Sequence, residues 1–175
     1  MLPKEDENRS VQDVMIQRVT TSENVAVVVG LAQTIWHEHF PSVISHDQID
    51  YMLGRFLSHR VISAQISEDY QYYLIGDPES PVGFMAVVPQ DGGLHISKLY
   101  VLKEVRGRGL SREALVFLED ICQREGYARL WLRVNSHNEL AIAVYKRLGF
   151  EVCDTLVQDI GAGFVMDDYV MDKSL

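Results

Sequence analysis

The most constraining feature of the sequence is the stretch LHISKLYVLKEVRGRGLSREAL at residues 94–115, which predicts a strand, a glycine turn and the start of a helix. Alternation along the strand places His95 on the same face as Leu99. In the turn, Gly107 and Gly109 allow the backbone to bend tightly and to approach a ligand. This order directs unpaired backbone N–H groups and the positive end of a helix dipole at one point. The stretch therefore predicts an anion site, most simply for a phosphate.

The glycine turn matches neither of the common phosphate-binding patterns, GxxxxGK[ST] and GxGxxG. It resembles instead the Q/R-x-x-G-x-G/A signature of the GNAT superfamily of acetyl-CoA-dependent N-acetyltransferases. Ser111 replaces the usual glycine or alanine, and as a small polar residue it is predicted to cap the helix. The resemblance implies that main-chain N–H groups of this turn, with two arginines adding charge, hold the pyrophosphate. The residues concerned are Arg106, Gly107, Arg108, Gly109, Leu110 and Ser111.

A second motif follows the apolar strand LWLRV at residues 130–134. It is similar to the N-x-x-A-x-x-x-Y-x-x-x-G-F stretch of the same family. The resemblance implies that Tyr145 protonates the departing CoA thiolate, whereas its position alone also fits a core tyrosine bonded to backbone. It implies that Asn138 hydrogen-bonds the CoA arm, and the position of this residue also fits a helix N-cap. The matching residues are Asn138, Ala141, Tyr145, Gly149 and Phe150.

The order of predicted elements indicates a mixed α/β fold in one domain over residues 14–175, after a flexible N-terminus at residues 1–13. The resemblance implies a mixed, mostly antiparallel sheet with a central splayed strand pair, flanked by helices. Backbone groups of Leu99 and Val101 would then hydrogen-bond the pantetheine arm, and an N–H near Leu99 would polarise the thioester carbonyl. Strands are predicted at 14–20, 70–76, 82–88, 94–102 and 130–134, with one or two more in 151–175 around a turn at 161–163. Helices are predicted at 24–38, 45–54, 59–67, 111–125 and 139–148.

Acetylation of an amine also needs a base, because an alkyl ammonium ion has a pKa of about 10.4. Forming the free amine at neutral pH costs roughly 4 to 5 kcal/mol unless the site helps. His95 is the first candidate for this base because it is predicted to share the face of Leu99, although a histidine in such a strand is often structural. The other candidates are His37, Glu38, His39, Asp167 and Asp168.

Aromatic and acidic residues outside the two motifs are candidates for the wall of the amine pocket, and most of them equally fit core or surface positions. A metal site at His37-x-His39 is not expected, since no third or fourth ligand is evident. The candidate wall residues are Trp36, Phe40, Tyr51, Phe164, Asp168 and Tyr169.

The composition limits the partners of this chain. A formal net charge of -9 disfavours nucleic acid and anionic membranes as partners, and no apolar run is long enough to span a membrane. The N-terminus lacks the apolar region of a signal peptide. Cys122 and Cys153 are both predicted to be buried free thiols, which favours a reducing cytoplasm and argues against a thiol acyl-enzyme.

Taken with the resemblance, these features predict an N-acetyltransferase that uses acetyl-CoA as cosubstrate, needs no metal, and is cytoplasmic. The acceptor is a primary amine of a small molecule or peptide that attacks the thioester directly, and a homodimer is left open. The alternative is a non-catalytic CoA-binding domain that acts as a sensor or scaffold. A nucleotide-binding protein of another fold is disfavoured, because the phosphate-loop lysine is missing.

Overall fold

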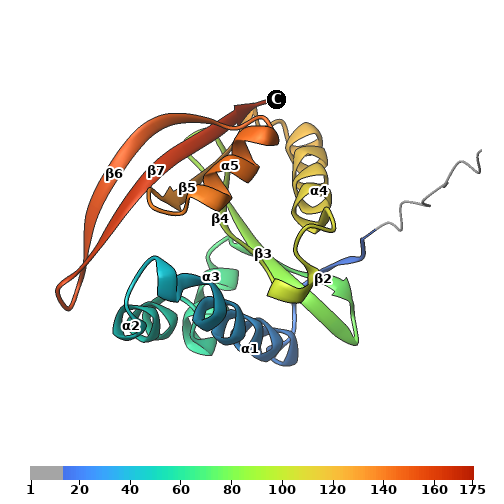
Figure 1. Ribbon diagram of the computed structural model, residues 1–175. Helices are drawn as coiled ribbons and strands as arrows, with labels where there is room; N and C mark the ends of the chain where they lie inside the picture. The colour runs from blue at the N-terminus through green and yellow to red at the C-terminus, as the bar shows by residue number, and fades with distance from the viewer. Residues whose placement is uncertain (1–13) are drawn as a thin grey trace, which may run out of the picture.

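The computed structural model describes residues 14–175 as one seven-stranded sheet with helices on both faces (Figure 1). The segment predicted to be flexible, residues 1–13, lies outside the described residues. The strand order is β1-β2-β3-β4-β5-β7-β6, and only the β4–β5 pair is parallel. The predicted mixed, mostly antiparallel sheet is confirmed. The strands are β1 (Ile16–Arg18), β2 (Gln71–Asp77), β3 (Ser80–Gln90), β4 (Gly93–Val101), β5 (Arg129–Asn135), β6 (Glu151–Gly161) and β7 (Phe164–Ser174).

The helices form two groups that cover opposite faces of the sheet. Helices α1 to α3 precede the sheet's long strands, and α4 and α5 flank β5 in the chain. Thr21 and Ser45 cap α1 and α2, since each side chain accepts a hydrogen bond at the start of its helix. None of the helices within residues 14–175 is long and apolar enough to cross a membrane. The helices are α1 (Ser22–His39), α2 (His46–Phe56), α3 (His59–Ser67), α4 (Leu110–Glu125) and α5 (Glu139–Arg147).

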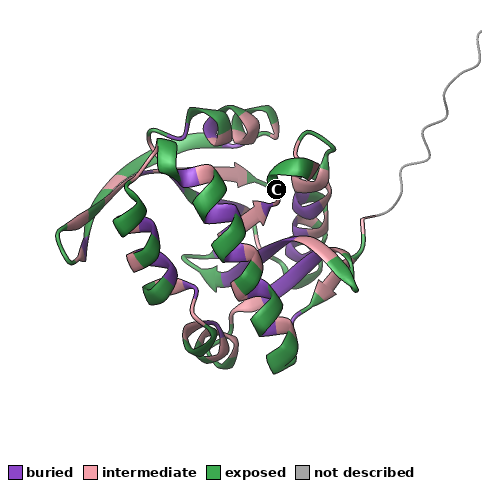
Figure 2. Ribbon diagram, turned by 60° about the horizontal axis from the view of Figure 1, so that its bottom comes forward, coloured by how far each residue is buried: buried purple, intermediate pink, exposed green. Residues whose placement is uncertain are grey.

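Two hydrophobic cores lie on the two faces, because side chains alternate along each strand. The α4 core packs Leu118 of α4 against Ile96 of β4 and Leu132 of β5. The α1 core packs Ile35 of α1 against Phe84 of β3 and its neighbours. Figure 2 shows the buried side of the helices turned toward the sheet. We name the two sheet faces the α4 face and the α1 face after these cores.

Several predicted boundaries are wrong by a few residues. The first strand is shorter than predicted, and α2 continues past Gly54 to Phe56. Strand β3 continues past its predicted end at residue 88 to Gln90, and Pro89 occupies one of the last rungs of the ladder, opposite Leu94. The hairpin turn is left with Asp91 and Gly92, both at positive φ, as a two-residue hairpin loop favours.

A β-bulge in β4 changes which residues share a face. Ala86 pairs with Lys98 whereas the next residue, Val87, pairs with Ile96, so β4 carries one extra residue, Ser97. Ile96 and Leu99 consequently both pack into the α4 core, although they are three positions apart and simple alternation would put them on opposite faces. The prediction that His95 shares the face of Leu99 is therefore wrong, because His95 alternates with Ile96 and lies on the α1 face.

The parallel strands β4 and β5 pair over only part of their length. Residues 94–96 pair with residues 130–132, and we call this part the closed end. Beyond it, residues 97–101 and 133–135 make no ladder pairs with each other, and we call this part the open end. The predicted splayed strand pair is confirmed, and it leaves a gap inside the sheet.

Strand β6 is the outermost strand of the sheet and forms a long hairpin with β7 (Figure 1). Most of its residues are exposed. The far end of the hairpin contacts helix α2, where the Tyr51 hydroxyl donates a hydrogen bond to the carbonyl of Ile160 at 2.9 Å.

Candidate functional site

Unpaired backbone of β4 faces the gap at the open end. The Leu102 N–H donates to the Val82 carbonyl on β3, so the backbone groups of alternate residues of β4 point toward β3. Those of Leu99 and Val101 then point the other way, into the gap. The carbonyl of Val101 agrees with this direction, because it accepts a hydrogen bond from Nε of Arg106 at 3.3 Å. The edge at Leu99 is therefore available to a ligand that can pair with a strand.

The start of α4 offers free N–H groups beside this edge. Gly107 and Gly109 have φ of 77° and 84°, a region that an L side chain rarely adopts. Gly109 is the N-cap, and no side chain caps the helix, so the prediction that Ser111 caps α4 is wrong. Ser111 lies one residue inside the helix that begins at Leu110. The first helical hydrogen bond is donated by the N–H of Glu113, which leaves the N–H groups before it for an anion.

The other four α-helices within residues 14–175 begin differently from α4. In each of them a side-chain oxygen at the N-cap accepts a hydrogen bond from the first turn. Helix α4 is thus the one α-helix in this part of the chain whose start is not satisfied by its own cap. The capping residues are Thr21, Ser45, Ser58 and Asn138.

A chain of three polar side chains links both motifs to the end of α1. Nη1 of Arg106 lies 3.1 Å from Nδ1 of His39, and Nε2 of His39 lies 3.4 Å from Nδ2 of Asn138. A guanidinium only donates, so Nδ1 of His39 must accept, and Nε2 then carries the ring proton. Nδ2 of Asn138 is a donor as well, so its contact with Nε2 is one of proximity and not a hydrogen bond. Burial, together with the charge of Arg106, lowers the pKa of His39, which keeps the imidazole neutral. The Asn138 side-chain oxygen caps α5 through the N–H of Ala141, as its predicted alternative role requires.

Tyr145 reaches the same region from α5. Its ring packs against the α4 core, 5.6 Å from the ring of Phe150. Burial raises the pKa of Tyr145 to about 12, so its hydroxyl keeps its proton at neutral pH. Tyr145 is also close enough to Tyr100 of β4 for its charge to raise the pKa of that residue. The α4 core that this ring packs against includes Val101 and Val134 of the open end.

An aromatic cluster covers the α1 side of the open end. The rings of Trp36 and Phe40 lie 5.7 and 6.1 Å from the ring of Tyr100. The Nε1 atom of Trp36 is buried and has no hydrogen-bond partner within residues 14–175. Sequence reasoning missed Tyr100, although an aromatic residue beside Leu99 on the central strand was a signal that could have found it.

The remaining candidates for the amine pocket are divided between the two faces. Tyr51 and Phe164 pack together on the α1 side with ring centroids 5.3 Å apart. Asp168 of β7 is 3% exposed and lies beside Asn135 of β5 in the ladder. Tyr169 packs instead into the α4 core, on the opposite face.

His95 lies at the closed end, away from the gap. It pairs with Trp131 across the β4–β5 ladder, and the two rings are stacked with centroids 3.9 Å apart. Burial lowers the pKa of His95 to about 4, and the nearby charges of Arg133 and Lys98 act in the same direction. Its Nδ1 atom is buried without a hydrogen-bond partner within residues 14–175.

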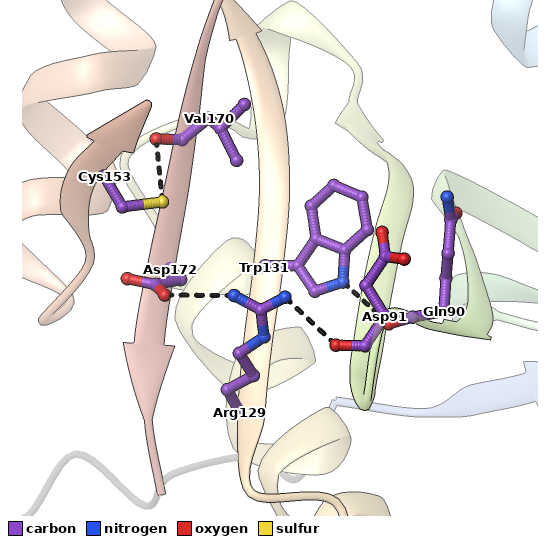
Figure 3. A network of polar contacts seen from close by, with 7 residues as sticks. All are labelled: Gln90, Asp91, Arg129, Trp131, Cys153, Val170 and Asp172. Atoms are coloured by element: carbon purple, nitrogen blue, oxygen red, sulfur yellow. Dashed lines mark hydrogen bonds and ion pairs between the residues drawn. The ribbon is translucent and has the colours of Figure 1, made fainter. Parts of the chain in front are cut away.

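The two cysteines differ in exposure. Cys122 is buried as predicted, and burial raises its pKa to about 11, so it is not a thiolate at neutral pH. Cys153 is exposed, and the prediction that it is buried is wrong, because β6 is the outermost strand. Its thiol donates to the carbonyl of Val170 at 3.5 Å (Figure 3).

A hollow of about 360 Å³ lies beside Cys153, on the same side of the sheet as Trp131. Arg129 crosses its edge, with Nη1 3.4 Å from Asp172 and Nη2 donating to the carbonyl of Asp91 (Figure 3). Residues 14–175 contain no group of three or more His, Cys, Asp or Glu side chains that could hold a metal ion.

Known proteins similar to this chain include acetyltransferases. The model of the acetyltransferase (GNAT) family matches residues 31–150. An uncharacterized N-acetyltransferase of Escherichia coli, YjgM, is 24% identical over 84% of this chain and 87% of its own length. The peptidyl-lysine N-acetyltransferase YjaB of the same organism is 33% identical over 50% of this chain and 54% of its own length.

Solved structures give the same fold. The PaiA N-acetyltransferase of Thermoplasma acidophilum, crystallised with coenzyme A, superposes with a TM-score of 0.77 at 18% identity. The match covers 93% of this chain and 99% of that one.

Proposed function

The chain belongs to the GNAT family of acetyltransferases, and on this premise we propose that it transfers the acetyl group of acetyl-CoA to a primary amine. The amine attacks the thioester directly, without an acyl-enzyme. The observation that carries the proposal is the uncapped start of α4, which stands beside the unpaired edge of β4.

Acetyl-CoA fits this arrangement because each of its parts meets matching chemistry. The pyrophosphate would lie at the free N–H groups of residues 109–112, with Arg108 adding charge. The pantetheine arm carries amides that would pair with the backbone of Leu99 and Val101, and Asn138 would hydrogen-bond the same arm. The guanidinium of Arg106 donates hydrogen bonds to Val101 and His39, so it would act on the pyrophosphate through its charge.

Tyr145 would donate its proton to the sulfur as the carbon–sulfur bond breaks. Its raised pKa supports this role, because the hydroxyl stays protonated until the thiolate forms. An N–H near Leu99 would stabilise the negative charge that develops on the acetyl oxygen. Support for direct attack comes from the cysteines, since Cys122 is buried with a raised pKa and Cys153 lies on the outer strand.

The acceptor is proposed to be a primary amine on a small molecule or a peptide. The similarity to a peptidyl-lysine N-acetyltransferase over half of this chain supports the inclusion of lysine peptides. The alternative function, a CoA-binding sensor or scaffold, would use the same phosphate site without turnover.

The test is a thiol-release assay with acetyl-CoA and a panel of alkylamines, polyamines, amino acids and lysine peptides, run beside calorimetric titration with CoA. In the Tyr145→Phe variant, kcat is expected to fall about 10²- to 10⁴-fold, because the acid is lost, while CoA affinity stays within about twofold. Tyr127→Phe is the matched control, since Tyr127 also packs at the α4 core. Tight CoA binding without turnover on any amine would favour the sensor, and absence of CoA binding would overturn both functions.

A further inference from the structure

Asp168 is an acidic side chain that the fold buries without an internal partner. It is 3% exposed, and the other two buried polar side chains are Lys98 and Asn138. Its carboxylate makes no hydrogen bond or ion pair within residues 14–175, and burial is the largest influence on its pKa. The fully covered side-chain polar atoms without partners belong to Trp36 and His95 instead, so a carboxylate oxygen of Asp168 keeps access to solvent. A buried acid of this kind costs stability unless a ligand pairs with it.

The position of Asp168 in the sheet places it at the open end. It is opposite Asn135, the last residue of β5, in the part of β5 that has separated from β4. Phe164 and Met166 of the same strand contact the α1 core, and Tyr169 contacts the α4 core. By alternation, Asp168 shares the α1 face with Phe164 and Met166. It therefore lies on the α1 side of the open end, where the aromatic cluster of Trp36, Phe40 and Tyr100 lies.

Asp168 and Tyr145 lie on different elements, Asp168 opposite Asn135 in the sheet and Tyr145 against the α4 core. The charges of both residues raise the pKa of Tyr100. The charged groups that act on Asp168 itself are Arg133 of β5, which favours ionisation, and Asp167 of β7, which opposes it. A carboxylate and a protonated hydroxyl thus stand on either side of the open end.

We propose that Asp168 is the catalytic base, and that it selects acceptors that arrive as alkylammonium ions. This inference rests on the proposed acetyl transfer. The ammonium ion of the acceptor would fill the place of the missing partner of Asp168, so the same contact that binds the acceptor also activates it.

Protons and bonds balance over the cycle. The ammonium ion gives one proton to the Asp168 carboxylate, and the neutral amine then forms the nitrogen–carbon bond. The carbon–sulfur bond breaks, Tyr145 protonates the sulfur, and the second proton of the nitrogen, now acidic, returns to Tyr145 through solvent. Asp168 finally releases its proton to water. Burial assists the first transfer because it disfavours both charges of the ammonium–carboxylate pair.

The two histidines considered for this role have poorer positions. His95 lies at the closed end and stacks on Trp131. His39 has its Nδ1 atom engaged by Arg106. Asp168 is raised in pKa to about 6, so it is ionised at neutral pH and still a stronger base than an ordinary carboxylate.

The experiment measures kcat/KM between pH 5 and 9 with the best alkylamine of the panel, for the wild type and Asp168→Asn. In the wild type, kcat/KM is expected to rise to a plateau above about pH 6. In Asp168→Asn only the free amine reacts, so kcat/KM is expected to fall about 10²- to 10⁴-fold at pH 7 and to rise about tenfold per pH unit. Asp167→Asn, which removes the same charge one residue away, and His95→Gln are expected to keep the plateau.

CoA titration shows that each variant is folded. If Asp168→Asn fails to bind CoA, Asp168→Glu is measured instead. The pH at which its kcat/KM rises to the plateau is expected to differ from that of the wild type. An active wild type whose Asp168→Asn variant keeps both its rate and its plateau overturns the assignment alone, as does loss of the plateau in His95→Gln. A wild type that binds CoA but acetylates no amine overturns the proposed function, and the assignment falls with it.

Discussion

The closed and open ends of the β4–β5 pair are made by the same two strands, yet the backbone groups are paired at one end and unpaired at the other. At the closed end the backbones are paired, and His95 stacks on Trp131. At the open end the Leu99 edge has no strand partner, and Asp168 has no side-chain partner within residues 14–175. Since unpaired backbone groups inside a protein are costly, the difference in backbone pairing indicates that the closed end serves stability and the open end serves binding.

The largest expected effect is a loss of stability when the closed end is altered. Trp131→Ala removes a large side chain that is 4% exposed, together with its stack on His95. We expect the free energy of unfolding to fall by about 3 to 5 kcal/mol, measured by urea denaturation. CoA affinity, measured by calorimetry at low temperature, should stay within about threefold. A large loss of CoA affinity in the folded variant would show that the closed end also serves binding.

Acid should act on the two ends in opposite directions. The pKa of His95 is lowered to about 4, so the native state loses stability as the pH falls from about 6.5 to 4, by up to about 3 kcal/mol. The pKa of Asp168 is raised to about 6, so its burial penalty is relieved as the pH falls from about 6 to 3.8, by a similar amount. The two contributions nearly cancel in the wild type.

Single variants would reveal the two contributions separately. Relative to the wild type, His95→Gln should gain stability as the pH falls from 7 to 4, and Asp168→Asn should lose it. Urea denaturation at a series of pH values measures both. Parallel curves for the wild type and the two variants would contradict the assignment of opposite signs.

A smaller effect is expected at the start of α4. Ser111→Glu places a carboxylate among the free N–H groups, where it would repel the pyrophosphate, so CoA affinity should fall by about 30-fold, or roughly 2 kcal/mol. Stability should be unchanged or slightly higher, because an acid near a helix start is favourable. Leu140→Glu occupies the equivalent position of α5, which Asn138 already caps, and serves as control. Equal losses in the two variants would mean that α4 holds no phosphate.

The sequence was sufficient for features that depend on local order. The glycine turn predicted the start of α4. The splayed strand pair followed from the family resemblance and is confirmed by the ladder. These features depend on neighbours within a few residues or on a motif that spans the site.

Features that depend on distant contacts could not be predicted in this way. The face of His95 was wrong because one extra residue in β4 changes the alternation, and the sequence of β4 contains no glycine or proline there to mark the bulge. The link between His39 and Arg106 joins residues 67 positions apart. The exposure of Cys153 depends on β6 being outermost, which strand order decides and local pattern does not.

The position of β6 at the rim of the sheet also bears on how the protein behaves at high concentration. An outermost strand offers unpaired N–H and C=O groups on which a strand of another molecule can assemble, and here it is 11 residues long. Three exposed acids, Glu151, Asp154 and Asp159, are spread along it. Two such rims would repel each other on approach, so the strand carries its own protection against fibril-like growth.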